Sequence, residues 1–303
     1  MTVSTVHFRM WVEYIALRGV AALVRLVPLE TAASASAAVW VRIAPRISKK
    51  RHQRALANLR IAFPHKSEAE RLAICMAHWR NLGRVMVETM LIDRIIADPR
   101  RISISDAKVL ERYRGKLGPA IGVSLHMGNW ELAIWPLTSL GANPAAVYRS
   151  VTNPYVDNYL KRLRKDLYPA GLFGRGNEER EDSDDRRTAR IITDFVRSGG
   201  RLGLVCDQFY RRGIPVPFFF GFVSTQPIAA IIARRVGARV WIARCKRIGA
   251  SSRFVVDVRE VRVPRTANVG QDIREIQAEI LNQFESWIRE CPEQWMWSNR
   301  VWA

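Results

Sequence analysis

The sequence predicts an α/β protein in which helices flank a mostly parallel sheet and a helical region precedes that sheet. Residues 1–92 carry apolar side chains at helical spacing, the chain after Pro99 alternates short apolar strands with helices, and an amphipathic helix closes the sequence. Strands that alternate with helices are typical of a parallel sheet, because a helix provides the crossover between two parallel strands. A hydrophobic content of 48% is enough to bury a full core and excludes disorder for most of the chain.

The first 92 residues predict helices throughout. Pro28 ends a first apolar helix, and Ser67 and Glu70 have the spacing of a capping box that opens a periodic run through Trp79. We predict a helical N-terminal region over residues 1–92 and an α/β region over residues 93–303, which together form one continuous domain.

The α/β region is predicted from apolar runs and periodicity. The expected strands cover residues 119–126, 145–150, 201–206, 238–245 and 254–263. The expected helices cover residues 129–140, 154–167, 186–198 and 227–236, and a last helix carries the apolar stripe from Ile273 to Trp287.

Basic residues exceed acidic ones, with 48 Lys and Arg against 28 Asp and Glu for a net charge of +20. Residues 1–66 alone hold 11 basic and two acidic side chains. Such a field attracts polyanions, which include nucleic acid, anionic lipid, phosphorylated substrates and acidic carrier proteins. The four cysteines are scattered without metal or disulfide spacing, which fits a reducing cytoplasm.

The N-terminal helix is apolar from Met10 to Leu29 but is interrupted by Glu13, Arg18 and Arg25. A charge near the middle of a bilayer costs about 2.5–3.5 kcal/mol, which argues against a clean span. With Trp11 beside these charges, the pattern favours a helix that lies in the membrane interface. An ordinary core helix of a soluble protein is the alternative.

His126 is the histidine that the pattern singles out. It ends the strand 119–126, and the carboxyl ends of parallel strands face the ligand crevice. Glu131 follows five residues later, and because His126 precedes the helix, its ring can fold back to meet this carboxylate. A carboxylate on one ring nitrogen leaves the other free to take a proton, so we predict His126 as a general base held by Glu131. A hydrogen-bonded structural histidine is the alternative.

The simplest chemistry is direct transfer without a covalent enzyme intermediate. The chain contains no G-x-S-x-G elbow, no Walker motif and no Rossmann glycine pattern, and Cys206 lies inside an apolar strand.

Several motifs together resemble the lipid A biosynthesis acyltransferases, the lauroyl and myristoyl transferase family. They are ALANLRIAFPHKSEAER (55–71), HMGNWE (126–131), CDQ (206–208), PVPFFFG (215–221) and PEQWMW (292–297). Their order and spacing extend the resemblance from about residue 10 to 300.

The resemblance implies a glycerolipid-acyltransferase-like fold that moves a fatty acyl group from acyl carrier protein to a hydroxyl of a lipid A precursor. It places the enzyme at the cytoplasmic face of a bacterial inner membrane, peripheral or held by a single N-terminal anchor, among anionic lipids. It implies no metal, no other cofactor and no nucleic-acid partner.

By position, the resemblance implies two catalytic and five substrate-binding residues. The catalytic pair is His126 and Glu131, and the substrate-binding residues are Asn129, Arg149, Asp207, Gln208 and Arg300. Asn129 is expected near an oxyanion, and Arg149 near a phosphate or the thioester carbonyl. Residues 218–220, all phenylalanine, either line an acyl channel or belong to the core.

One departure and two alternatives stay open. Asn299 stands where the family usually has His before Arg300, which puts that position in doubt. The same motifs resemble phosphatidylinositol mannoside acyltransferases, so the acceptor is another membrane glycolipid in one alternative. In the other, the chain is a non-catalytic basic protein that binds membranes or nucleic acid, and His126 is incidental.

Overall fold

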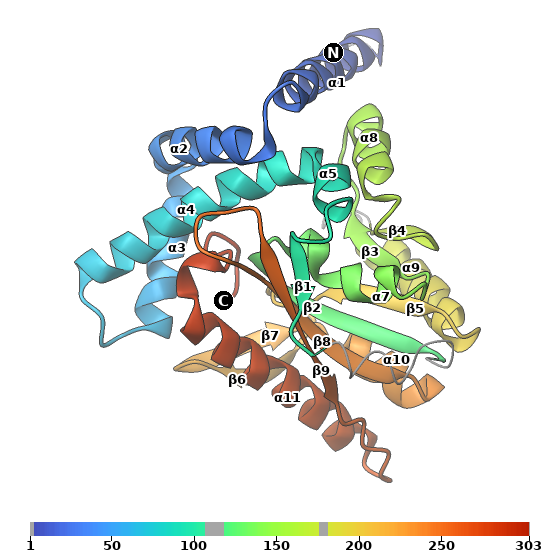
Figure 1. Ribbon diagram of the computed structural model, residues 1–303. Coiled ribbons are helices and arrows are strands. Elements are labelled where there is room, and N and C mark those ends of the chain that lie inside the picture. Colours follow the sequence, from blue (N-terminus) through green and yellow to red (C-terminus); the bar gives the residue numbers. More distant parts are fainter. Residues whose placement is uncertain (1–2, 107–117, 176–180, 303) are drawn as a thin grey trace.

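A computed structural model describes residues 3–106, 118–175 and 181–302 (Figure 1). The described helices are α1 (Val3–Arg25), α2 (Leu29–Ile47), α3 (Lys49–Ala62), α4 (Glu68–Met90), α5 (Ile92–Ile96), η1 (Trp130–Ile134), α7 (Trp135–Ser139), α8 (Pro154–Arg164), α9 (Glu181–Arg197), α10 (Ile228–Val236), α11 (Val269–Glu290) and η3 (Pro292–Gln294), where η marks a 3-10 helix. The described strands are β1 (Ile102–Ile104), β2 (Ala120–Gly128), β3 (Ala145–Arg149), β4 (Gly171–Arg175), β5 (Arg201–Val205), β6 (Ile214–Phe218), β7 (Gly221–Thr225), β8 (Arg239–Arg247) and β9 (Phe254–Val261).

Seven of the described strands form one sheet in the order β1-β9-β8-β2-β5-β3-β4, and β6 and β7 form a separate hairpin. Neighbouring strands of the large sheet are parallel except β8 and β9, which are antiparallel. The predicted α/β class with a mostly parallel sheet and flanking helices is therefore confirmed. The boundary proposed at residues 92 and 93 stays a prediction.

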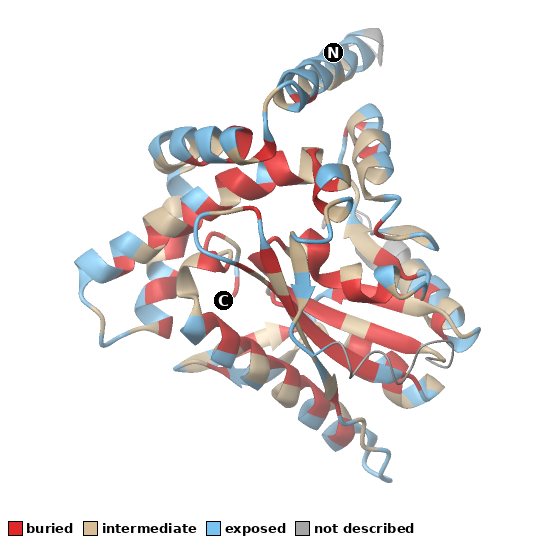
Figure 2. Cartoon of the chain, viewed as in Figure 1, coloured by how far each residue is buried: buried red, intermediate tan, exposed pale blue. Residues whose placement is uncertain are grey.

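The central strand β2 separates two hydrophobic clusters because successive side chains of a strand point to opposite faces. Its odd-numbered residues Ile121, Val123, Leu125 and Met127 lie in the cluster formed with α10, α11 and the C-terminal tryptophans. The other cluster lies on the opposite face, with η1, α7 and α5. In Figure 2 the middle strands are mostly buried, whereas α1 is mostly exposed.

Helix α4 begins as the sequence predicts. The amide of Glu70 donates to Ser67 Oγ at 3.3 Å, and the amide of Ser67 donates to the Glu70 carboxylate at 2.8 Å, which completes the capping box. Helix α4 then packs along α2 and reaches the C-terminal turn η3, so it connects the helical layer to the edge of the sheet where β2 ends.

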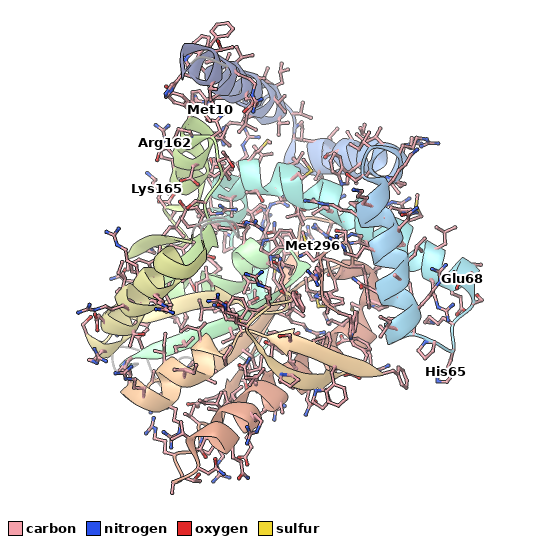
Figure 3. All side chains as sticks on the ribbon, turned by 180° about the vertical axis from the view of Figure 1, so that it is seen from behind. Met10, His65, Glu68, Arg162, Lys165 and Met296 are labelled. Atoms are coloured by element: carbon pink, nitrogen blue, oxygen red, sulfur yellow. The ribbon has the colours of Figure 1, made fainter. Side chains whose placement is uncertain are left out.

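Helix α1 projects from the molecule and touches mainly α8. Asn153, the N-cap of α8, donates to the carbonyl of Met10 at 2.7 Å and to Glu13 at 3.1 Å. Figure 3 shows Met10 on α1 next to Arg162 on α8 at one end of the molecule. Within the described ranges, no helix has both the length and the apolar character that crossing a bilayer requires.

Two local predictions are wrong. Residues 129–140 form the 3-10 helix η1 followed by the short helix α7 instead of one helix, and Pro136, which lacks an amide hydrogen, stands at the start of α7 where such a donor is not needed. Strands β1, β4, β6 and β7 were not predicted; Gly171 begins β4, and Pro215 and Pro217 interrupt the pattern of β6.

Candidate active site

His126 lies where β2 approaches its end, on the edge of the sheet formed by the carboxyl ends of the parallel strands. Strand β2 pairs with β5 in the register Ser124 to Val205, so His126 is level with Asp207, the second residue after β5. The side chain of His126 is 17% exposed, whereas that of Asp207 is 2% exposed. The histidine can therefore meet a substrate, and the aspartate cannot.

Asp207 binds both the backbone and the ring of His126. The amide of His126 donates to Asp207 Oδ2 at 2.8 Å, and His126 Nδ1 lies 2.7 Å from Oδ1. Burial alone would raise the pKa of Asp207, but the His126 ring and the hydrogen bonds donated by His126 and Trp295 more than offset it and hold this pKa below its usual value. A carboxylate that accepts the Nδ1 proton leaves Nε2 as the basic nitrogen.

The C-terminal PEQWMW segment holds this pair in place. Trp295 Nε1 donates to Asp207 Oδ2 at 2.7 Å, and the amide of Met296 donates to the carbonyl of His126 at 2.9 Å. Trp295 itself is fully buried. Figure 3 places Met296 near the centre of the molecule, between the helical layer and the sheet. The motif thus acts as a support for the ends of β2 and β5.

The predicted contact between Glu131 and His126 is wrong. Glu131 instead forms a two-pronged ion pair with Arg164 of α8, with Arg164 Nε at 2.7 Å and Nη2 at 2.5 Å from its carboxylate. The 3-10 turn of η1 carries Glu131 toward α8, whereas the parallel register brings Asp207 to the histidine. Burial alone would lower the pKa of Arg164, but Glu131 raises it above its ordinary value, so the guanidinium stays charged.

Asn129 does not face a substrate. Its side chain is fully buried and donates to Glu88 at 3.1 Å, while Glu88 pairs with the buried Arg247. The predicted oxyanion role of this side chain is therefore not supported. Gly128, just before it, has a φ of +57°, and a Cβ there would lie 1.8 Å from the carbonyl oxygen of Cys245. Only glycine fits this close approach.

The remaining predicted site residues lie along the same edge. Gln208 Nε2 is 3.3 Å from His126 Nε2, so the amide is beside the basic nitrogen. Arg300 lies with Cζ 4.1 Å above the ring of Phe209, and its carbonyl accepts the amide of Phe209 at 3.0 Å. Arg149 is exposed at the end of β3. A substrate contact for Arg149 and Arg300 stays a prediction.

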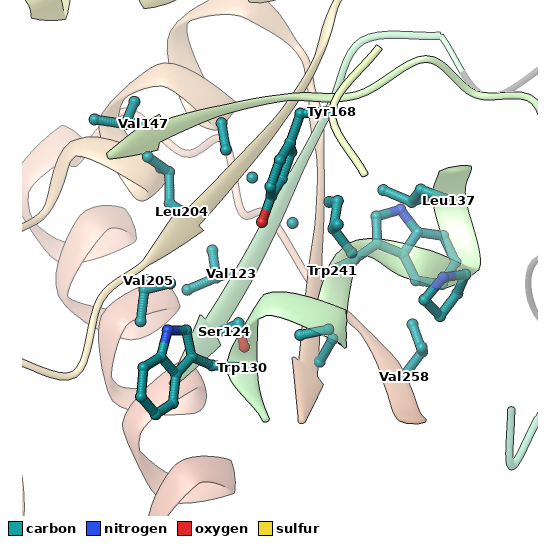
Figure 4. Close-up of a pocket in the computed structure, with 17 residues that line it drawn as sticks. Val123, Ser124, Trp130, Leu137, Val147, Tyr168, Leu204, Val205, Trp241 and Val258 are labelled. Atoms are coloured by element: carbon teal, nitrogen blue, oxygen red, sulfur yellow. The ribbon is translucent and has the colours of Figure 1, made fainter. Parts of the chain in front are cut away.

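An apolar pocket (Figure 4) is lined in part by Ser124 and Val205, which precede His126 and Asp207 by two residues on their strands. It lies between the sheet and the η1–α7 segment, and its empty space is about 590 Å³ when the open solvent at its mouth is included. The lining residues include Ser124, Trp130, Ile134, Leu137, Tyr168 and Val205. Trp130 packs edge-on against the His126 ring with 5.2 Å between ring centroids, which connects the pocket to the histidine.

The phenylalanines at 218–220 do not line this pocket. Phe218 is 2% exposed and packs on Trp295, and Phe220 is 60% exposed at the tip of the β6–β7 hairpin. Sequence reasoning missed the pocket because its walls come from five strands, η1 and α7, and their side chains share no local pattern.

A sequence model of the bacterial lipid A biosynthesis acyltransferases matches residues 2–303. The "Lipid A biosynthesis acyltransferase 1" of Shigella flexneri is 24% identical over 262 residues, which cover 84% of this chain and 76% of the relative. The "Lipid A biosynthesis myristoyltransferase" of Escherichia coli (strain K12) shows the same identity and coverage. With the family match extending over nearly every residue, the chain belongs to the bacterial lipid A biosynthesis acyltransferases and is an acyltransferase.

Proposed function

We propose that this acyltransferase moves a fatty acyl group from the thioester of acyl carrier protein to a hydroxyl of a lipid A precursor, with His126 as general base. The observation that carries the mechanism is the contact of 2.7 Å between His126 Nδ1 and Asp207 at the edge of the sheet. It leaves Nε2, which the Gln208 amide approaches to 3.3 Å, as the nitrogen that accepts a proton.

The reaction consists of one nucleophilic attack and two proton transfers. Nε2 of His126 takes the proton of the acceptor hydroxyl as its oxygen attacks the thioester carbonyl. The tetrahedral intermediate then expels the carrier thiolate, which recovers the proton from the imidazolium. Asp207 stabilises that imidazolium, and no acyl-enzyme forms. The Gln208 amide, 3.3 Å from Nε2, is placed to donate to the developing oxyanion.

The acyl chain occupies the apolar pocket of Figure 4. A fatty acyl chain requires a binding site that excludes water. The residues between Trp130 and Leu137 that line the pocket supply apolar side chains. Val205, which lines the pocket, is 38% exposed. It forms the entrance on the side of β5 next to Asp207, where the thioester carbonyl would meet His126.

The enzyme binds the cytoplasmic face of the bacterial inner membrane through α1. Phe8, Trp11 and Leu23 on this helix are 67%, 50% and 66% exposed, although large apolar side chains are favourable only when they leave water. The net charge of +20 attracts both anionic lipid and an acidic carrier protein.

The test is transfer of a labelled acyl group from acyl carrier protein to a tetraacylated lipid A precursor. The wild type should transfer, and His126→Ala should lose about 10²–10⁴-fold in kcat while its unfolding curve stays normal. Equal turnover by the folded variant would favour the non-catalytic alternative. If the wild type acylates a phosphatidylinositol mannoside but not the lipid A precursor, the proposed acceptor would be wrong, whereas the proposed reaction mechanism would stand.

A further inference from the structure

Two glycines face each other in the middle of the sheet, Gly122 on β2 and Gly203 on β5. Neither has a positive φ, so the backbone conformation does not require glycine at either position. Glycine also weakens a strand, because it has no side chain to pack. Another physical reason must therefore explain the two glycines. The neighbouring residues indicate that the reason is the space left by the two missing side chains.

The glycines form the floor of the apolar pocket. In the cross-strand row Ala146, Gly203, Gly122, Trp241, the two central positions carry no side chain. All four residues line the pocket, and Ile134 and Leu137 cover it from η1 and α7. The next row toward His126 contains Ser124 and Val205, so the glycine row lies farther from His126.

The space above the glycines is narrow. A Cβ on Gly122 would lie 3.8 Å from Ile134 Cδ1 and 4.0 Å from Leu137 Cδ1, and a Cβ on Gly203 would lie 3.2 Å from Ile134 Cδ1. A methyl group on either glycine would thus touch the opposite wall. At Gly122 the contact would be of ordinary length, so the substitution fills space without a clash.

We propose that Gly122 and Gly203 set how deep the acyl chain enters, and so select the length of the acyl group. The inference rests on the proposed function, because it takes the pocket as the acyl site. Gly122 is four residues from His126, or about 13 Å along the strand at roughly 3.3 Å per residue. Chains that end before this row would not sense the glycines, whereas the terminal methyl group of a longer chain would have to enter the narrow space over them.

Tyr168 also lines the pocket. Figure 4 shows it at the end away from Ser124 and Trp130, with its hydroxyl directed into the pocket. Burial raises the pKa of this hydroxyl, and Glu131 adds to the effect, so the phenol stays neutral. A neutral, bulky side chain is compatible with one end of an apolar pocket.

The decisive variant is Gly122→Ala, tested with acyl carrier protein loaded with saturated chains of graded length. We expect transfer of the longest accepted chains to fall by roughly 10–200-fold in kcat/KM, the range for one methylene in an apolar pocket. Shorter chains should react as in the wild type. Gly270→Ala, in the first turn of α11 and outside the pocket lining, is the matched control and should leave the length profile unchanged.

A second variant removes a methyl group from the wall opposite Gly122. Ile134→Val shortens the side chain whose tip would meet the new methyl group, so Gly122→Ala/Ile134→Val should recover part of the long-chain activity. A length profile of Gly122→Ala equal to that of the wild type would overturn the inference. A uniform loss at every length would do the same, because it would reveal a general defect instead of selection.

Binding separates this inference from the proposed reaction. Fatty acids of graded length should raise the Tm of the wild type, with the largest shift at a longer chain than for Gly122→Ala, because a ligand stabilises the state that it binds. If the wild type transfers no acyl group to any acceptor while this difference persists, the proposed reaction fails and the pocket assignment stands. An equal dependence of Tm on chain length in both proteins would refute the pocket assignment.

Discussion

The carboxylate of Asp207 accepts hydrogen bonds from the backbone of His126, the ring of His126 and the indole of Trp295. A buried carboxylate with several donors stays ionised and holds its partners in fixed directions. In the proposed mechanism, this carboxylate sets the tautomer of His126 before a substrate arrives.

A buried histidine, His78, makes the fold sensitive to acid. Burial lowers the pKa of His78 to about 3, whereas an unfolded histidine titrates near 6.5. As the pH falls below about 6.5, the unfolded chain takes up a proton that the folded chain does not, so folding loses up to about 1.4 kcal/mol per pH unit until about pH 3.

We expect His78→Leu to flatten this dependence. The free energy of urea unfolding, measured between pH 7.5 and 4 for both proteins, should decline less steeply in the variant. Above pH 7 the histidine is neutral in both states, and any difference there reports packing alone. Parallel curves across the whole range would contradict the account.

At the residue scale, the sequence predicted that His126 lies at a strand end, but not which carboxylate contacts it. The pattern H-x4-E suggested Glu131 because the two are close in sequence. The actual partner is 81 residues away, and the choice depends on β2 and β5 being neighbours. Local spacing contains no information on strand order.

At the scale of elements, the end of β2 is held by a buried polar network from α4. Asn81 donates to the carbonyl of Gly128 at 3.0 Å and also contacts Arg247, and Glu88 binds both Arg247 and Asn129. Buried polar groups that are paired in this way impose one geometry on the chain. The turn after His126 therefore has little freedom.

Two glycines with positive φ allow a test of how strongly packing constrains the turn after His126. Gly118 has a φ of +62° with no atom near its missing Cβ, whereas a Cβ on Gly128 would collide with the backbone of Cys245. We expect Gly118→Ala to cost about 1–2 kcal/mol from backbone strain alone. Gly128→Ala should cost more than twice as much in urea unfolding, since the backbone itself must move. Equal losses would mean that the close approach is unimportant.

The helices and strands with strong periodicity were predictable, and the irregular ones were not. The capping box at Ser67 fixed the start of α4, and the apolar run before His126 fixed β2. The segment after Asn129 was predicted as one helix because Trp130, Ile134 and Leu137 have helical spacing. Periodicity does not distinguish a 3-10 turn followed by a short helix from one continuous helix.

At the scale of the whole molecule, charge and exposed apolar surface are separate features. Basic side chains produce the net charge of +20, whereas Phe8 and Trp11 stand exposed on the projecting helix α1. Electrostatic attraction weakens as salt rises, because the Debye length falls from about 10 Å at 0.1 M to about 3 Å at 1 M. Burial of apolar side chains does not weaken in this way.

Binding to vesicles that contain phosphatidylglycerol should therefore have two parts. Raising the salt from about 0.1 to 1 M should weaken binding of the wild type. Phe8→Ser/Trp11→Ser should weaken it further at every salt concentration. Phe222→Ser removes an apolar side chain that is 69% exposed on β7, far from α1 in the sequence, and serves as the control. If the double variant binds as the wild type does, α1 is not the membrane contact.

The identity of the group that orients His126 is the central claim, and kcat of Asp207→Asn against Glu131→Gln tests it most directly. With acyl carrier protein and the lipid A precursor saturating, Asp207→Asn should lose about 10²–10⁴-fold in kcat, because the amide cannot stabilise the imidazolium. Glu131→Gln should mainly lose stability through its broken pair with Arg164, and its folded fraction should keep most of its kcat. A large loss of kcat in folded Glu131→Gln, together with near wild-type turnover by Asp207→Asn, would contradict the account.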